Sequence, residues 1–122
     1  EWGGFTPASK FPLLMRIYFL FTLGEAQTVR QNTPFSMKLD SCRKHTLGAM
    51  ANGALFDHVN GGFFRYCLDR EWKSPHFEKM LSDNALLVST YSRSLRKFQN
   101  PRDQKIILKT LDWIEREMGS PD

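Results

Sequence analysis

Apolar residues recur at helical spacing in four stretches of the chain. The first stretch follows Pro12, and the second runs from about Ser36 to Asn52. Between them lies Asn32-Thr33-Pro34, and the residue before a proline is driven out of the α region, so this tripeptide is expected to end the first helix. Gly53 is expected to end the second helix as a C-terminal glycine. The apolar stripe of the second helix would consist of Leu39, Cys42, Leu47, Met50 and Ala51.

The third and fourth stretches each begin with a polar residue followed by proline. Ser74-Pro75 and Asn100-Pro101 are expected to place a capping side chain just before a proline in the first helical turn. These helices would continue to Phe98 and Met118, and Gly119 and Pro121 would end the fourth. Its apolar stripe would be Ile107, Leu111, Ile114 and Met118.

A long segment, Ala54 to Lys73, connects the second and third helices. It contains Gly61-Gly62, and the run from Phe63 to Asp69 could form a short strand that turns toward Trp72. Connections of this length are usually functional when they occur between packed helices. We therefore expect an all-α fold of helical hairpins, with a long loop or a short β-ribbon near residues 54–73.

The chain carries a formal net charge of +4, and part of the excess lies late in the sequence. Such a charge suits a nucleic-acid surface. The cations alternate with apolar residues at helical spacing, however, which favours a solvated helix face, so a nucleic-acid partner is not expected. The residues concerned are Arg93, Arg96, Lys97, Arg102, Lys105 and Lys109.

The sequence contains no pattern typical of a cofactor or metal site. Cys42 and Cys67 are too far apart for a C-x-x-C motif, and reduced thiols favour a reducing, cytoplasmic location. The three histidines lack the spacing of paired metal ligands, and no phosphate-binding glycine loop is present, so no metal or cofactor is expected. The apolar run 11–23 is shorter than the roughly 20 residues that span a bilayer, so no membrane partner is expected.

Specific motifs follow one another through the loop and its flanks. They are Thr46 to Gly53, Asp57-His58, Gly61-Gly62-Phe63, Arg65-Tyr66 and Pro75-His76-Phe77-Glu78-Lys79-Met80-Leu81. This series closely resembles the family that includes spermatogenesis-associated protein 20 and its bacterial relatives. The likeness extends from Gly3-Gly4-Phe5 to Arg116-Glu117-Met118 and so covers essentially the whole chain.

The resemblance implies a thioredoxin-like domain followed by an (α/α)6 toroid similar to six-hairpin glycosidases and N-acylglucosamine epimerases. Residues 1–122 would be the first two hairpins of that toroid, without the thioredoxin-like domain and the remaining hairpins. A sugar epimerase-, isomerase- or glycosidase-like activity is implied by fold analogy. The alternative is a non-catalytic binding or scaffold domain that serves the thioredoxin-like domain of the same protein.

The chain begins at Glu1 rather than at methionine, so we expect it to be a piece of a longer protein. Two hairpins cannot close a toroid of six, and the surfaces that would pack on the other hairpins should be apolar. We therefore expect the isolated chain to be inactive and to associate with copies of itself.

In a toroid, the loops at one end surround a central pocket, which makes the ionisable residues near the third helix candidates for catalysis. Sugar isomerisation needs a base and an acid, and histidine and glutamate can serve. His76, Glu78 and Asp57 are the candidate catalytic residues. Their alternatives remain open: His76 could cap or pack, Glu78 could complement the helix dipole, and Asp57 with His58 could order the loop.

Seven further residues are candidates for ligand binding. Arg65 could orient a hydroxyl or carboxylate with its guanidinium, or could form a structural bridge with Asp69. Trp72 could stack on a sugar or fill the core. Asn84, which falls in the apolar face of the third helix, needs hydrogen-bond partners and could tie that helix to the loop. The full set is His58, Arg65, Tyr66, Asp69, Trp72, Asp83 and Asn84.

Overall fold

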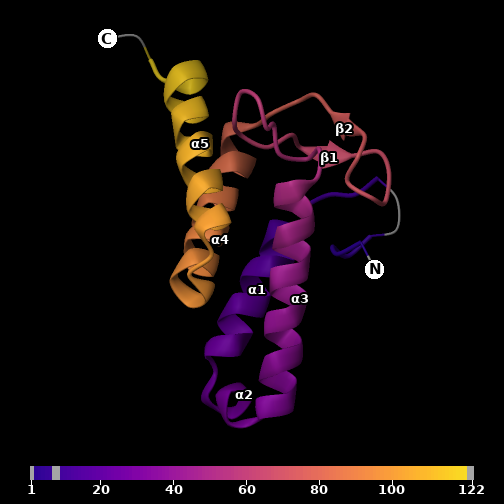
Figure 1. The fold of residues 1–122 in the computed structure, drawn as a ribbon, viewed down its shortest axis with the longest axis vertical. Coiled ribbons are helices and arrows are strands. Elements are labelled where there is room, and N and C mark those ends of the chain that lie inside the picture. The colour runs from indigo at the N-terminus through magenta and orange to yellow at the C-terminus, as the bar shows by residue number, and fades with distance from the viewer. Residues whose placement is uncertain (1, 7–8, 121–122) are drawn as a thin grey trace.

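The computed structural model describes residues 2–6 and 9–120. Helices α1 (Leu14–Glu25) and α3 (Thr33–Asn52) form one hairpin, with the short α2 (Gln27–Gln31) at its bend. Helices α4 (Leu81–Phe98) and α5 (Pro101–Met118) form a second hairpin beside it (Figure 1). The segment between the hairpins carries β1 (Tyr66–Cys67) and β2 (Pro75–His76). The prediction of an all-α fold of helical hairpins is confirmed, whereas closure into a toroid stays a prediction.

The boundary between the first two predicted helices differs from the expectation. Ala26 is extended and separates α1 from α2. The first helical stretch ends before Asn32 as expected, since α2 ends at Gln31, but Pro34 lies in the first turn of α3, which Asn32 caps by accepting the N–H of Phe35 at 3.3 Å. Proline is compatible with a first helical turn, where its missing N–H has no partner to lose.

The predicted start of the third helix at Ser74 and Pro75 is wrong. Pro75 and His76 pair with β1, and α4 begins only at Leu81 after an extended Met80. The start of α5 is as predicted, with the Asn100 side chain accepting the N–H of Arg102 at 3.0 Å. Gly119 follows its last residue, while Pro121 lies outside the described residues.

The hydrophobic core is shared by the helices and the connecting segment. Leu47, Leu87 and Tyr91 are fully buried between α3 and α4. Side chains of the segment complete this core, which makes it a packed part of the fold rather than a flexible linker; they are Leu55, Phe56, Phe63, Cys67 and Trp72.

The two cysteines have different surroundings, and both are free thiols. Burial raises the pKa of Cys67 to about 12, so its thiol stays protonated at neutral pH. Cys42, expected in the apolar stripe of the second helix, is exposed instead. The buried Arg43 occupies the inward face beside it, with its guanidinium bonded to Asp40 and to the carbonyl of Leu20.

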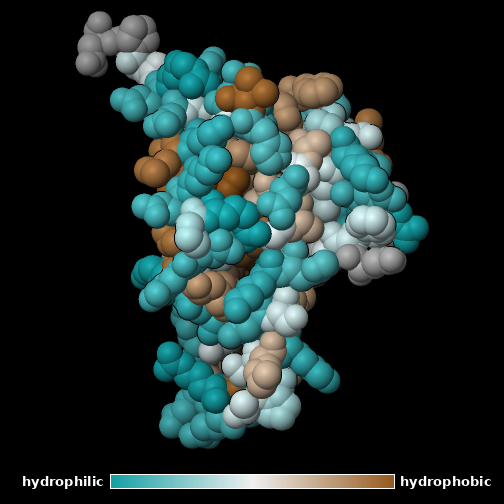
Figure 2. Space-filling model, viewed as in Figure 1, coloured by the Kyte–Doolittle hydropathy of each residue, from teal (hydrophilic) through white to brown (hydrophobic). Residues whose placement is uncertain are grey.

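Helix α5 presents large apolar side chains on its outer side. The predicted stripe of α5 is not its buried face, since Ile106, Thr110 and Trp113 point inward and Leu111 and Met118 are exposed. Figure 2 shows hydrophobic residues emerging along the edge of the molecule formed by α5. Among the described residues, no helix has the length and apolar character needed to cross a membrane.

Self-association of the chain stays a prediction, and the outer side of α5 offers a way to test it. We expect Leu111→Glu to reduce association, because a charge would oppose burial of the apolar surface around it. Sedimentation velocity at increasing protein concentration measures the effect. A monomer at every concentration for the unmodified chain would contradict the prediction.

Candidate functional site

A short β-ribbon organises the surface that precedes α4. Tyr66 faces His76 and Cys67 faces Pro75 in an antiparallel pair. Asp69 holds the turn between the two strands: its carboxylate accepts the N–H of Glu71 at 2.6 Å and those of Lys73 and Ser74. Burial opposes ionisation of Asp69, but these hydrogen bonds prevail and lower its pKa. The Asp69 carboxylate therefore stabilises the turn. It does not form the salt bridge considered above with Arg65, which pairs with Glu78 and Asp83 instead.

Three aromatic rings lie stacked on this ribbon. The rings of Tyr66 and His76 are 4.8 Å apart with an interplanar angle of 11°. Phe11 stacks on Tyr66, with centroids 4.5 Å apart. His76 and Phe11 are exposed, so the stack forms part of the molecular surface.

Charged groups gather beside this stack, around Arg65. The Nη1 of Arg65 lies 3.5 Å from a carboxylate oxygen of Glu78, and its Nε lies 3.8 Å from Asp83. The backbone N–H of Arg65 also donates to the carbonyl of Glu78 at 2.8 Å. These three side chains are between about one third and one half exposed, so the cluster is accessible to solvent and to a ligand.

A groove of about 390 Å³ opens next to this cluster. Arg65 and Asp83 line one side, and the beginning of α1 lines the other. Its remaining lining is mostly apolar and consists of Phe11, Pro12, Leu13, Leu14, Met15, Arg16 and Leu86. Volumes of this size hold small ligands, which bind through apolar walls and a few polar groups.

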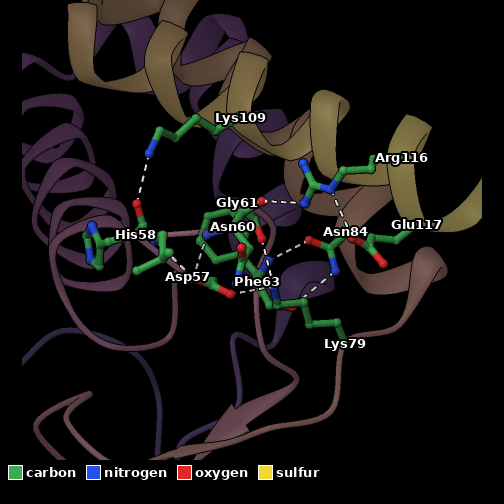
Figure 3. Close-up of polar contacts among 11 residues, drawn as sticks. Asp57, His58, Asn60, Gly61, Phe63, Lys79, Asn84, Lys109, Arg116 and Glu117 are labelled. Atoms are coloured by element: carbon green, nitrogen blue, oxygen red, sulfur yellow. Dashed lines mark hydrogen bonds and ion pairs between the residues drawn. The ribbon is translucent and has the colours of Figure 1, made fainter.

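Asp57 and His58 lie elsewhere, in a turn that is anchored to α5 (Figure 3). The carboxylate of Asp57 accepts the N–H groups of Val59 and Asn60 and pairs with Lys79 at 2.7 Å. Lys109 donates to the carbonyl of His58 at 2.8 Å. Asp57 and His58 thus order the loop, which is the alternative considered from the sequence.

The electrostatics of Asp57 follow from this arrangement. Burial opposes its ionisation, but the hydrogen bonds from Lys79, Asn60 and Val59 together with the charge of Lys79 lower its pKa. The Lys79 amino group also donates to the carbonyl of Gly61 at 2.7 Å and lies over the rings of Phe64 and Trp113. Lys79 was not singled out from the sequence, although it stands inside the Pro75–Leu81 motif, because its partners are distant along the chain.

Two of the candidate ligand-binding residues are buried. Trp72 is 1% exposed, and its indole N–H donates to the carbonyl of Trp2 at 3.0 Å. Asn84 is fully buried, accepts the N–H of Phe63 at 2.7 Å and donates to the carbonyls of Phe63 and Met80. The expectation that Asn84 ties its helix to the loop is confirmed, and Trp72 fills the core rather than offering a stacking surface.

The structure therefore divides the candidate residues into three groups. Arg65, Tyr66, His76, Glu78 and Asp83 share one surface beside the groove. Asp57 and His58 belong to the turn held by Lys79 and Lys109, whereas Asp69, Trp72 and Asn84 serve the turn and the core. His76 lies in β2 and Glu78 lies two residues before Met80, the N-cap of α4, so neither residue stands in the first turn of a helix.

Comparison with known proteins identifies close relatives over nearly the whole chain. The chain is 43% identical over 119 residues to spermatogenesis-associated protein 20 of Homo sapiens, and equally to that of Rattus norvegicus. A Caenorhabditis elegans relative, the uncharacterized protein B0495.5, is 40% identical over 90 residues. The match to the human protein covers 98% of this chain but only 15% of the relative's length. No family model matches the chain.

Proposed function

Because the chain belongs to the family of spermatogenesis-associated protein 20, we propose that it contributes part of a site for a sugar or sugar-like molecule in a carbohydrate-active domain. The observation that carries the proposal is the juxtaposition of two surface features. Arg65, Glu78 and Asp83 form an accessible charged cluster at the groove, and the Phe11–Tyr66–His76 stack lies next to it.

This combination of groups suits the chemistry of a sugar ring. Aromatic side chains bury a large apolar area, and they can cover the C–H face of a sugar. A guanidinium and carboxylates offer several donors and acceptors for its hydroxyl groups. The groove supplies an apolar wall from α1, so a ring could be held between this wall and the charged cluster.

The same groups could carry out proton transfer in a complete domain. Glu78 and Asp83 approach one guanidinium, and glycoside hydrolysis uses paired carboxylates separated by roughly 5–10 Å. His76, on the same surface, could move a proton during isomerisation, since an imidazole can both accept and donate a proton. The substrate would then be a sugar, and the thioredoxin-like domain of the longer protein would be a partner domain.

A scaffold role is the second candidate, and one observation favours it. Arg65 already pairs with both Glu78 and Asp83, and ion pairs of this kind can simply fix the ribbon to the start of α4. In that case the cluster would stabilise the fold and no sugar would bind. The two functions therefore differ in what the loss of Arg65 does to ligand binding.

Titration of the 122-residue chain with glucose and N-acetylglucosamine tests the proposal. We expect weak binding that Arg65→Gln reduces about tenfold, because a hydrogen bond to a charged group contributes roughly 1.5–3 kcal/mol. NMR chemical-shift changes measure the affinity and the site together.

Arg96→Gln is the matched control, since Arg96 is exposed near the opposite end of α4 and should leave sugar binding unchanged. No binding of either sugar, combined with lower thermal stability of Arg65→Gln, would contradict the sugar site and support the scaffold.

A further inference from the structure

The basic residues in the C-terminal part of the chain form two separate groups. The helix dipole explains the position of only one group. Arg93, Arg96 and Lys97 line a pocket at the end of α4, where the helix dipole favours positive charge. Arg102, Lys105 and Lys109 line a different pocket, along the first half of α5. The dipole disfavours cations at a helix N-terminus, so Arg102 in the first turn is not placed there by this effect.

The pocket on α5 encloses about 330 Å³ between the end of α3, the 54–58 segment and α5. Its floor is apolar and buried, formed by Ala51, Phe56 and Ile106. Asn52 and His58 complete the lining, and no carboxylate is among the lining residues. The pocket thus combines an apolar floor with a rim of positive charge.

Each of the three cations keeps at least one hydrogen-bond donor without a partner among the described residues, although the free Nη1 of Arg102 lies near Gly48 of α3. Arg102 uses its Nε and Nη2 to bind the buried carboxylate of Asp103, which leaves Nη1 without a partner in the described part of the chain. Lys109 donates one proton to the carbonyl of His58 and has two more (Figure 3). Lys105 is exposed and makes no hydrogen bond or ion pair with residues 2–6 or 9–120.

We propose that this pocket binds the phosphate group of a small phosphorylated molecule. Lys105 and Lys109 place two ammonium groups on one face of α5, and Arg102, whose charge is balanced by Asp103, can add an N–H donor, so together they match an anion with several acceptor oxygens. The enclosed apolar floor favours a compact ligand over an extended polyanion, which would need a continuous basic surface. The proposal is independent of the sugar site, because no lining residue of the two pockets is shared.

Titration of the ¹⁵N-labelled chain with inorganic phosphate, at constant ionic strength set by chloride, tests this site. We expect saturable shifts confined to the amides around Asn52, His58 and Lys105. Lys105→Gln should weaken phosphate binding about tenfold, the effect of losing one charge-assisted hydrogen bond. Lys38→Gln removes the same charge from an exposed position on α3 and should leave the affinity unchanged.

Two further titrations, with glucose 6-phosphate and with an oligonucleotide, identify the kind of molecule that carries the phosphate. Glucose 6-phosphate should bind more tightly than inorganic phosphate, since its ring can contact the apolar floor. A single-stranded oligonucleotide of twelve bases should bind no more tightly per phosphate than the free ion. Shifts spread over all the cations of α4 and α5, tighter binding of the oligonucleotide, or equal losses in Lys105→Gln and Lys38→Gln would each overturn the proposal.

Discussion

Replacing Asn84 with leucine is expected to destabilise the chain by about 4 kcal/mol. The substitution keeps the size of the side chain but removes both hydrogen bonds to the backbone of Phe63. Phe63 is 1% exposed, so water cannot replace the lost partners of its N–H and carbonyl. Each buried polar group left without a hydrogen bond costs roughly 1–3 kcal/mol. Chemical denaturation monitored by circular dichroism measures the change in the free energy of unfolding.

Asn52→Leu provides the matched control, because Asn52 is an exposed asparagine near the end of α3. We expect its effect to stay within about 0.5 kcal/mol, as for most surface substitutions. An Asn84→Leu chain as stable as the control would show that the helix is not tied to the loop through this amide.

Lys79→Met is expected to cost about 3 kcal/mol. The side chains of Lys79 and Asp57 are 12% and 13% exposed, and removing one partner of a largely buried ion pair leaves the other charge uncompensated. The loss should also free the carbonyl of Gly61 and loosen the turn on α5. Thermal unfolding of the single and double variants, with Asp57→Asn as the second substitution, isolates the pair. Additive effects of the two substitutions would contradict a direct interaction.

The same pair predicts how stability depends on pH. The pKa of Asp57 is lowered in the folded chain, so its stabilising effect is present above its unfolded pKa, near 3.9, and is lost as pH falls through the lower folded value. In Lys79→Met this lowering is reduced, so the free energy of unfolding should fall less between neutral and acid pH than in the unmodified chain. An equal fall in the two chains would argue against the role given to Lys79.

The helices were predictable because their signals are local. Asn100-Pro101 caps and begins α5 as the sequence indicates. Ser74-Pro75 carries the same signal but lies in a ribbon, because the Asp69 carboxylate captures the N–H of Ser74 and the β1 strand pairs with Pro75. A local pattern of this kind is compatible with a helix start and with a β-ribbon. Which of the two forms depends on contacts with a strand or a turn elsewhere in the sequence.

The candidate site was predictable in its residue types but not in its partners. Arg65 and Glu78 were singled out from the sequence, yet their pairing depends on the ribbon that brings residues 13 positions apart together. Lys79 and Asp57 are 22 positions apart, and no periodic pattern links them. The sequence alone allows Trp72 to be either a surface residue or a core residue. Its packing against Gly53 and the N-terminal segment places it in the core.

The proposed sugar site is tested most directly by intermolecular nuclear Overhauser effects between the ¹³C-labelled chain and unlabelled N-acetylglucosamine. We expect contacts from the sugar to the rings of Phe11 and Tyr66 and to the methyl groups of Leu14 and Leu86, which border the groove and the charged cluster. Contacts confined to α5, or none at sugar concentrations that saturate the chemical-shift changes, would contradict it.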